Sequence, residues 1–447
     1  MAPPTTMPAA ARQLVRRYYT YAGIYTLAAS IIWGINTLFL LDAGLSVAEV
    51  FIANAAFSVG TVLFEIPTGV VADTIGRRVS FLLSLVVLAT STLGYVWLAQ
   101  VGGGVVAFSA VSVFMGLGFT FYSGAMEAWL VDGIRSLGFD GGLDRIFARA
   151  QIIGGASMLI GTVGGGLLGQ IDLAIPFLVR AGLLFVLLAL AWAGMRDIGF
   201  TPRPVTLATL PAEATAIART GVTEGWSSRP LRLIMIAGAL QNGFFMWAWY
   251  AWQPYFLELL GDDAVWVAGV VAALLSVALM AGNALVSVVT RWCGRRTTIL
   301  VWAAVVFSLA SIGVGLANTF VVALGFLLVV AVAMGITMPV RQTFIHGMVA
   351  SEQRATIVSF DSLISGVGAV GGQSGLGVLS GREGYSIAYI VGGGVALLAA
   401  PTLWFARRMR ADADFFEGPH AVEADGCAPQ GLPAIASVKA KRSLRRR

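Results

Sequence analysis

The sequence predicts an all-α integral membrane protein with about twelve spanning helices. Hydrophobic residues make up 57% of the 447-residue chain and charged residues only 12%, which is about half the charged share of a soluble domain. Long uncharged stretches alternate with short polar segments along most of the chain, and about 20 apolar residues in a helix cross a bilayer core of about 30 Å. The 54 glycines suit close packing between such helices. This composition excludes a soluble globular protein.

Two uncharged stretches, residues 79–126 and 297–340, are too long for one helix each. We expect the first to break at residues 102–104, which are all glycine, and the second at Asn318-Thr319. The uncharged part of the first span exceeds a signal-peptide core, so we expect it to be retained. The expected spans are 19–41, 48–72, 79–100, 105–130, 147–170, 173–195, 232–258, 264–290, 297–317, 320–346, 355–380 and 385–406.

Basic residues test this count independently, because they collect on the cytoplasmic side of membrane proteins. With the N-terminus inside, the expected outer loops contain one arginine, Arg382, beside acids such as Asp42, Asp172 and Glu258. The expected inner segments contain Arg77, Arg78, Arg135, Arg145, Arg149, Arg196, Arg203, Arg219, Arg229, Arg232, Arg291, Arg295, Arg296 and Arg354. We therefore expect a multi-pass protein of a plasma membrane, the bacterial inner membrane, with both termini in the cytoplasm.

The polar segments divide the chain into four parts. Residues 1–199 form an expected N-terminal six-helix bundle, and residues 230–410 form a second one. Between them, residues 200–229 are the longest polar interruption and are expected to be a cytoplasmic linker. Residues 411–447 are expected to be a disordered basic tail in the cytoplasm, with attraction to anionic lipid as the alternative.

The two halves also repeat one another. Phe39-Leu40 recurs 217 positions later as Phe256-Leu257, and Gly118 recurs as Gly335 at the same offset. The triplet that begins at Gly76 recurs 218 positions later, at 294–296. Parallel internal repeats with a binding site at their interface are a known arrangement in membrane transporters.

The short inner loop between the second and third spans carries a recognisable motif. Residues 69–78 read Gly-Val-Val-Ala-Asp-Thr-Ile-Gly-Arg-Arg, a G-x-x-x-D-x-x-G-R-R pattern. This pattern resembles the signature of the major facilitator superfamily, and the segments 65–68 and 123–132 are similar to its drug-efflux-like members. The resemblance implies two pseudo-symmetric six-helix bundles, alternating access, and a central cavity lined by the first, fourth, seventh and tenth spans.

The resemblance also implies a latch between the halves on the cytoplasmic side. Gly69 would allow close approach of a neighbouring helix, and Asp73 would face the N-terminus of the eleventh span, where a carboxylate is favoured. Gly76 permits a tight turn, and Arg77 and Arg78 are expected to reach Asp132 at the end of the fourth span. The alternative is that the two arginines only set the topology. The expected gating residues are Gly69, Asp73, Gly76, Arg77, Arg78, Asp132 and Arg354.

Ionisable residues inside spans are functional candidates because their charge is expensive to bury in lipid. We expect Glu65, Glu127 or Asp361 to carry a coupling proton, with structural pairing as the alternative. Arg341 is expected to face Glu127 across the cavity, and Arg180 is expected to extend to the outer membrane interface. Residues 111–116 lack the arginine that proton-driven exporters of this superfamily carry.

The seventh span is unusually aromatic, and such walls with few polar anchors suit flat amphipathic ligands, including cationic ones. The alternative is that these rings belong to an interfacial aromatic belt. The candidate cavity residues are Trp33, Asn36, Tyr122, Gln241, Asn242, Phe245, Trp249, Gln253 and Arg341.

These observations predict a proton-coupled secondary transporter that exports small amphipathic compounds or drugs. An uptake permease for a small metabolite is the nearest alternative, and a non-transporting membrane receptor or scaffold is the alternative from another class. We expect no enzymatic activity, no cofactor and no metal, since the chain has only two histidines and no phosphate-binding G-x-x-x-x-G-K-[ST] loop. The expected partners are the lipid bilayer, a small-molecule substrate and protons, with no nucleic acid, and the protein is expected to be a monomer.

Overall fold

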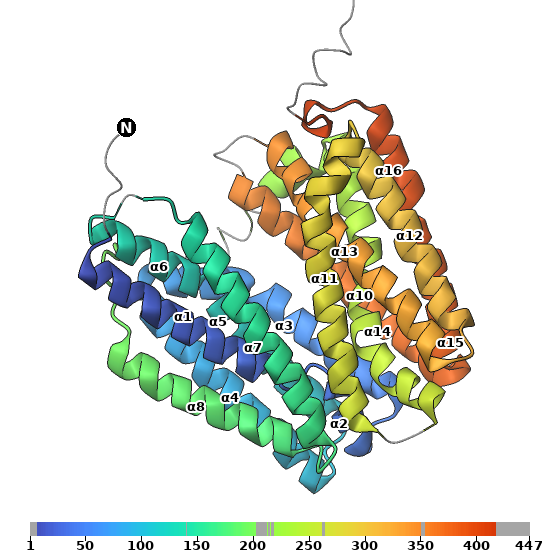
Figure 1. Cartoon of the computed structure of the whole chain (residues 1–447), viewed down its shortest axis with the longest axis horizontal. Helices are drawn as coiled ribbons and strands as arrows, with labels where there is room; N and C mark the ends of the chain where they lie inside the picture. The colour runs from blue at the N-terminus through green and yellow to red at the C-terminus, as the bar shows by residue number, and fades with distance from the viewer. Residues whose placement is uncertain are drawn as a thin grey trace, which may run out of the picture.

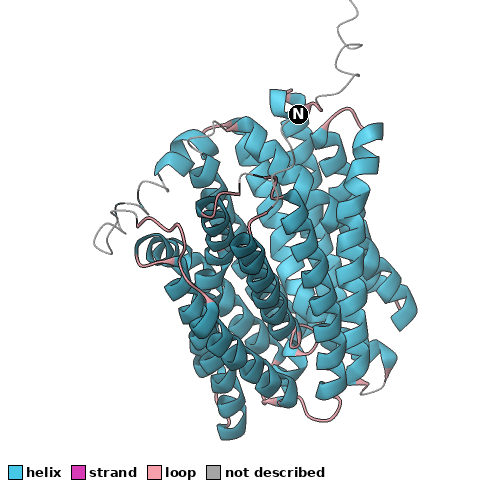
Figure 2. Cartoon of the chain, turned by 60° about the vertical axis from the view of Figure 1, so that its left-hand side comes forward, coloured by secondary structure: helices cyan, strands magenta, loops and turns pink. Residues whose placement is uncertain are grey.

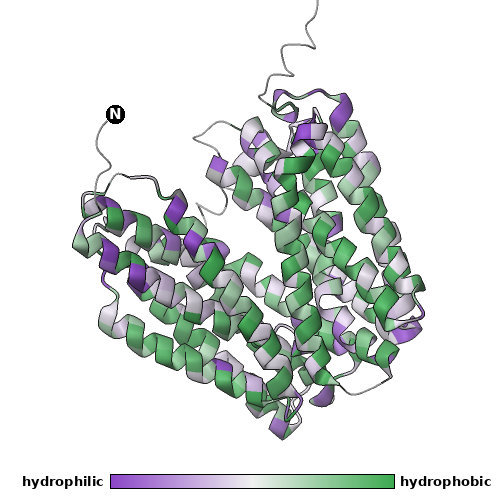
Figure 3. Ribbon diagram, in the orientation of Figure 1, coloured by the Kyte–Doolittle hydropathy of each residue, from purple (hydrophilic) through white to green (hydrophobic). Residues whose placement is uncertain are grey.

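The computed structural model describes residues 7–139, 141–202, 212, 215, 219–261, 264–349 and 354–416. Over these residues the regular structure is helical, apart from one isolated antiparallel bridge between Arg295 and Phe415. Figure 2 shows the helices lying roughly alongside one another, with short connections at their two ends. Apolar residues cover the middle of the helices, and hydrophilic residues gather toward the ends (Figure 3).

The α-helices are α1 (Ala9–Ser30), α2 (Asn36–Asp42), α3 (Val47–Thr74), α4 (Arg77–Val101), α5 (Val105–Ser123), α6 (Ala125–Ser136), α7 (Asp144–Gly169), α8 (Ile175–Gly194), α10 (Arg229–Leu260), α11 (Val265–Trp292), α12 (Arg296–Leu316), α13 (Phe320–Met348), α14 (Arg354–Glu383), α15 (Tyr385–Leu397) and α16 (Ala399–Arg408). A π-helical turn, η2 (Gly221–Trp226), and a 3-10 turn, η3 (Asp412–Asp414), complete the described elements.

The predicted all-α membrane fold is confirmed. Within the described part of the chain, eleven helical segments are long and apolar enough to cross a membrane, with α5–α6 and α15–α16 each counted as one segment. The first predicted span is divided at residues 31–35 into α1 and α2. Both predicted breaks are present, because α4 ends at Gly102 in the left-handed conformation (φ 68°) and α12 and α13 flank residues 317–319.

The helices form two groups (Figure 1). In the first, α3 and α4 pack on α5, α1 packs on α7, and α4 packs on α8. In the second, α10 packs on α14, and α12 and α11 pack on α13. We call the end that holds Ala9, Asp197, Arg229 and Phe416 the terminal end, and the opposite end the distal end.

The two groups meet toward the distal end and diverge toward the terminal end (Figure 1). The contacts between them are α3 with α14, α7 with α11, and α2 with α10. At the α7–α11 crossing, a Cβ on Gly166 would lie 2.7 Å from the Cα of Gly269, so only glycine fits at this approach. The described conformation is therefore closed by direct helix contact at one end only.

Packed structure extends into the expected linker and into residues 411–416, for which the expected disorder is wrong. In the linker, η2 lies against α14, with Gly225 close to Ile357. At the start of the expected tail, residues 411–416 are described and Asp414 is only 1% exposed. Residues 417–447 and most of 203–218 lie outside the described part of the chain.

Candidate functional site

A cavity of about 600 Å³ lies between the two groups of helices. Its walls come from α1 to α5, α7 and α8 in the first group and from α10, α11 and α13 in the second. Five of the nine cavity residues predicted from the sequence line it: Trp33, Asn36, Tyr122, Phe245 and Trp249.

The lining of this central cavity is mainly aromatic. Trp33 and Trp249, which belong to different groups, lie edge to face with their ring centroids 6.1 Å apart. Tyr25 and Tyr122 stack within the first group, at a centroid distance of 3.5 Å. Such a lining offers apolar area and ring faces to a flat solute.

Arg180 is the charged residue of the central cavity, and its predicted position at the membrane interface is wrong. It lies on the face of α8 that carries the buried Phe177, Ala181 and Leu184, and is itself only 8% exposed. A side chain on this inward face cannot extend along the lipid surface. The sequence prediction failed because position along a helix does not reveal which face a residue occupies.

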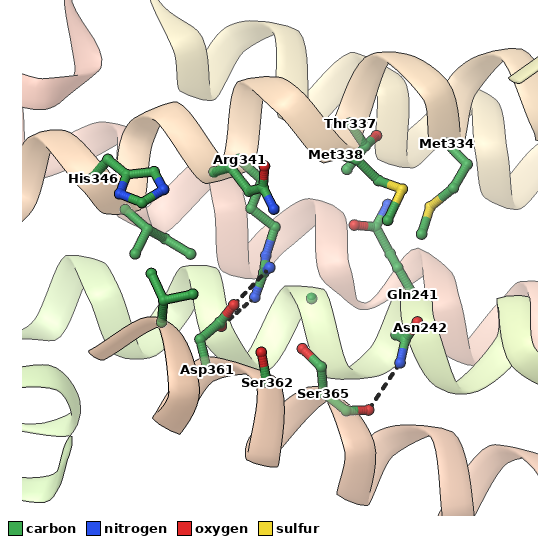
Figure 4. A pocket seen from close by; sticks show the side chains of 14 residues that line it. Gln241, Asn242, Met334, Thr337, Met338, Arg341, His346, Asp361, Ser362 and Ser365 are labelled. Atoms are coloured by element: carbon green, nitrogen blue, oxygen red, sulfur yellow. Dashed lines mark hydrogen bonds and ion pairs between the residues drawn. The ribbon is translucent and has the colours of Figure 1, made fainter. Parts of the chain in front are cut away.

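A second cavity, of about 180 Å³, lies within the second group between α10, α13 and α14 (Figure 4). Three other predicted cavity residues, Gln241, Asn242 and Arg341, line this second cavity. Met338 lines both cavities, so they adjoin one another.

The second cavity contains a buried ion pair. Arg341 Nη1 donates to Asp361 Oδ2 at 2.9 Å, and Nη2 donates to Asp361 Oδ1. A side chain at Gly238 would collide with the Arg341 guanidinium, so this glycine gives the arginine room against α10. The partner of Arg341 here is thus Asp361, not Glu127 as the sequence analysis expected.

The other two proton candidates have different surroundings. Glu65 on α3 and Glu127 on α6 are exposed in the isolated chain, whereas Asp361 is 8% exposed. Glu127 interacts electrostatically with Tyr18 and Tyr122. Of the three carboxylates, only Asp361 is both buried and held by a cation.

Gln253 lines neither described cavity but joins the two groups of helices. Its Nε2 donates to the Trp33 carbonyl at 2.8 Å, and its Oε1 accepts from the Thr37 backbone N–H at 2.9 Å. The break between α1 and α2 leaves these backbone groups free to bond outside their own helix. This predicted cavity residue is therefore part of the contact between α2 and α10.

The predicted gating loop is a network within the first group. Arg77 pairs with Asp73 at 2.6 Å and approaches Asp132 at 4.0 Å. Arg78 was also expected to reach Asp132, but its Nη2 donates to the Trp192 carbonyl at 2.9 Å and its guanidinium lies over the Trp192 ring.

Asp197 is a member of this network that the sequence analysis missed. Its Oδ1 accepts a hydrogen bond from the Arg78 backbone N–H at 2.9 Å, at the N-terminus of α4. Burial raises the pKa of the Asp197 carboxyl, and this effect outweighs the bond to Arg78 and its positive charge. Gly76, with φ 123°, makes room, because a Cβ there would collide with Asp197.

The second group repeats this arrangement. Asp414 accepts hydrogen bonds from the backbone N–H of Thr297 at 2.7 Å and from its hydroxyl at 2.8 Å, near the N-terminus of α12. Asp197 and Asp414 are 217 positions apart, the offset of the internal repeat. The sequence alone could have identified both aspartates as equivalent positions of the repeat, because they share its offset.

The remaining gating residues lie at the terminal end, where the groups diverge. A Cβ on Gly69 would meet nothing within 4 Å, so its expected close approach to a neighbouring helix is absent from this conformation. Arg354, the first residue of α14, has an exposed side chain. The latch between the halves therefore stays a prediction for a conformation closed at this end.

Comparison with known proteins decides the family. The model of the Major Facilitator Superfamily matches residues 19–292. The chain belongs to the major facilitator superfamily. This is a superfamily of membrane transporters rather than enzymes, so the chain is a multi-pass membrane transporter with a small-molecule substrate. A search of curated proteins found no match.

Solved structures agree on the fold of this superfamily member. The crystal structure of the nucleoside transporter NupG superposes with a TM-score of 0.72 at 12% identity, covering 88% of this chain and 99% of the other. The POT family transporter PepTSo gives a TM-score of 0.68 at 15% identity, over 90% and 100% of the two chains. A D-xylose-proton symporter gives 0.67 at 14% identity, over 89% and 98%. Similarity at this level of identity shows the fold and leaves the solute open.

Proposed function

We propose that this superfamily member is a secondary active transporter that exports small amphipathic compounds in exchange for protons. The observation that carries the proposal is the central cavity of about 600 Å³, lined from both groups of helices beside the place where they diverge. A solute held there contacts both groups at once. Relative motion of the groups then exposes it to one side of the membrane or the other.

The distal contacts are the parts that must break in such a cycle. Gly166 on α7 and Gly269 on α11 touch across the groups, and Gln253 bonds to the α1–α2 break. At the terminal end we propose that Gly69 and Asp73 approach α14 when the groups close there. The distal and terminal contacts would then form alternately.

The coupling proton is proposed to bind Asp361. An arginine stabilises the ionised form of a neighbouring carboxylate, so protonation of Asp361 and its pairing with Arg341 oppose one another. Met338 lines both cavities, and we propose that a movement of Arg341 reaches the central cavity through it. The pair therefore links proton binding to solute binding without a direct contact between the proton and the solute.

The topology of the proposal follows the distribution of arginines. The terminal end carries the predicted inner segments, so it is assigned to the cytoplasm of a plasma membrane, the bacterial inner membrane. In that orientation the described conformation opens toward the cytoplasm. The protein is proposed to act as a monomer, since one chain supplies both walls of the cavity.

Uptake with protons is the second candidate, and the Arg341–Asp361 pair favours it. A buried ion pair is a specific polar feature that a broad drug exporter does not need, whereas a permease for one metabolite uses such pairs to select its solute. The direction of proton movement separates export by exchange from uptake by symport.

The test uses liposomes that contain the purified protein, with a pH-sensitive dye inside. The liposomes are prepared with an acidic interior. Amphipathic aromatic compounds are then added outside, where they reach the cytoplasmic side of the proteins inserted inside-out. Proton exit on addition of a compound, absent from protein-free liposomes and lost in Asp361→Asn, supports exchange. Proton movement in the same direction as the compound supports symport, and no proton movement with any compound contradicts coupling altogether.

A further inference from the structure

The central cavity holds a buried cation that no described side chain neutralises. Arg180 is 8% exposed, and its electrostatic neighbours are the phenols of Tyr25, Tyr95 and Tyr250. Among the described residues that line the cavity, none is acidic. A charge inside a membrane protein is costly unless it is paired, so such a residue marks a functional position.

Arg180 also has a hydrogen-bond donor without a described acceptor. Its Nε is buried, and no described residue accepts a hydrogen bond from it. Buried donors in folded proteins almost always have partners, because leaving one unpaired costs about 1–3 kcal/mol. Among the described residues, Tyr25, Tyr95 and Tyr250 do not supply one, because none of them accepts a hydrogen bond from the Arg180 Nε.

A second unpaired donor lines the same cavity. Asn36 Nδ2 donates to Asn54 Oδ1 at 3.0 Å, which leaves the Nδ2 of Asn54 without a described acceptor although it is buried. Asn54 comes from α3 and Arg180 from α8, so two helices bring unused donors to one cavity. By contrast, the arginine of the neighbouring cavity is paired with Asp361.

From this arrangement we infer that the solute of the central cavity is an anion with an aromatic or other flat apolar body, and that Arg180 binds its negative group. A carboxylate, sulfonate or phosphate ester supplies the acceptor oxygens that Arg180 lacks and neutralises its charge. The Trp33 and Trp249 rings supply surface for the apolar body. This inference rests on the proposed function, and it replaces the sequence-based expectation that the ligands include cations.

Binding to the full-length protein in detergent tests the inference without any proton gradient. The probes are three matched series: 1-naphthoate, 1-naphthamide and 1-naphthylmethylamine; indole-3-acetate, its amide and tryptamine; and 4-biphenylcarboxylate with its amide and its aminomethyl analogue. Each series keeps the apolar body and changes the polar group and its charge. Affinities are measured by calorimetry on the wild type, Arg180→Gln, Arg180→Lys and the control Arg382→Gln, which changes an exposed arginine.

The expected result is that carboxylates bind the wild type and the Arg382→Gln control equally, and more tightly than their amides and amines. Arg180→Gln is expected to weaken carboxylate binding by at least about tenfold, and Arg180→Lys by less. Without ligand, Arg180→Gln is expected to melt at or above the wild-type temperature, because an unpaired buried charge is removed.

Three results would overturn the inference: equal binding of the three members of every series, unchanged carboxylate binding in Arg180→Gln, or no binding of any carboxylate. A lower melting temperature of ligand-free Arg180→Gln would likewise assign Arg180 to the internal structure. These results are separable from failure of the proposed function. If an anion binds but is never transported, the transport proposal alone is contradicted. If Arg180→Gln transports an uncharged solute, this inference alone is contradicted.

Discussion

Both carboxylate oxygens of Asp361 accept hydrogen bonds from the guanidinium of Arg341, between two helices of the second group. The two residues are 20 positions apart and lie on α13 and α14. The pair lines the second cavity together with Met338, which also borders the central cavity. The proposed protonation of Asp361 would act at this pair, next to the walls of the solute site.

Asp361→Asn is expected to abolish coupling while solute exchange persists. The amide cannot take up the proton, and it leaves the partly buried Arg341 without a counter-charge, so the variant is also expected to lose stability. The measurement compares solute accumulation driven by a pH gradient with solute exchange at equal pH. The exposed carboxylates Glu65 and Glu127 give the matched controls Glu65→Gln and Glu127→Gln, which should still accumulate solute. Gradient-driven accumulation by Asp361→Asn would refute the assignment of the proton to this residue.

Gly166→Val is expected to stop transport by preventing closure at the distal end. A side chain there would meet the backbone of Gly269 across the groups, whereas a Cβ on Gly164 would meet nothing within 4 Å. Gly164→Val is therefore the control on the same helix, with the same change in helix propensity. Solute exchange rates are measured in liposomes for both variants. Equal rates would show that the α7–α11 contact is not needed in the cycle.

Gly69→Val tests the proposed latch at the terminal end. In the described conformation the valine has open space, so the variant should fold with a melting temperature within a few degrees of the wild type. If the groups close at this end through a contact at Gly69, the added side chain blocks that closure and exchange falls steeply. Thermal unfolding and exchange are measured on the same preparation. Full exchange at normal stability would limit the arginines of this loop to a role in topology.

Residues 411–416 and residues 417–447 are expected to differ in their importance for stability. Removal of residues 417–447 should leave stability and solute flux unchanged, because the capping carboxylate Asp414 is kept. Removal of residues 411–447 deletes the cap of α12, and Asp414→Ala should lower stability by about 0.5–2 kcal/mol. Thermal unfolding and flux assays follow the three proteins. Loss of activity after removal of 417–447 alone would favour a scaffold that recruits partners through its tail.

The fold could be predicted from the sequence because lipid imposes a simple pattern. Spans of about 20 apolar residues and basic inner loops fix the number and direction of the helices. The break at residues 31–35 was not predicted, because it depends on hydrogen bonds to another part of the chain. Gln253 bonds to the backbone groups that the break leaves free. A hydrogen bond between residues 216 positions apart cannot be predicted from the local sequence of an apolar span.

The site could be predicted only where a residue type determines its surroundings. Aromatic residues of the seventh span reached the central cavity, as expected for Phe245 and Trp249. Arg180 was misplaced, because one apolar span gives little indication of which face turns inward. Asp361 was selected as an unusual charge in a span, but its partner depended on how α13 and α14 pack, which composition does not specify.

The most direct test of alternating access measures both ends of the molecule at once. Spin labels are placed in a background with Cys293→Ser and Cys427→Ser: one pair at 135 and 346 for the terminal end, and another at 171 and 321 for the distal end, all at exposed positions. Distance distributions are recorded by electron spin resonance for the otherwise wild-type protein, Gly166→Val and Gly164→Val. Alternating access predicts that Gly166→Val shortens the terminal-end distance and lengthens the distal-end distance together, while Gly164→Val matches the wild type. Distances that stay fixed at both ends, or that lengthen at both ends, would contradict it.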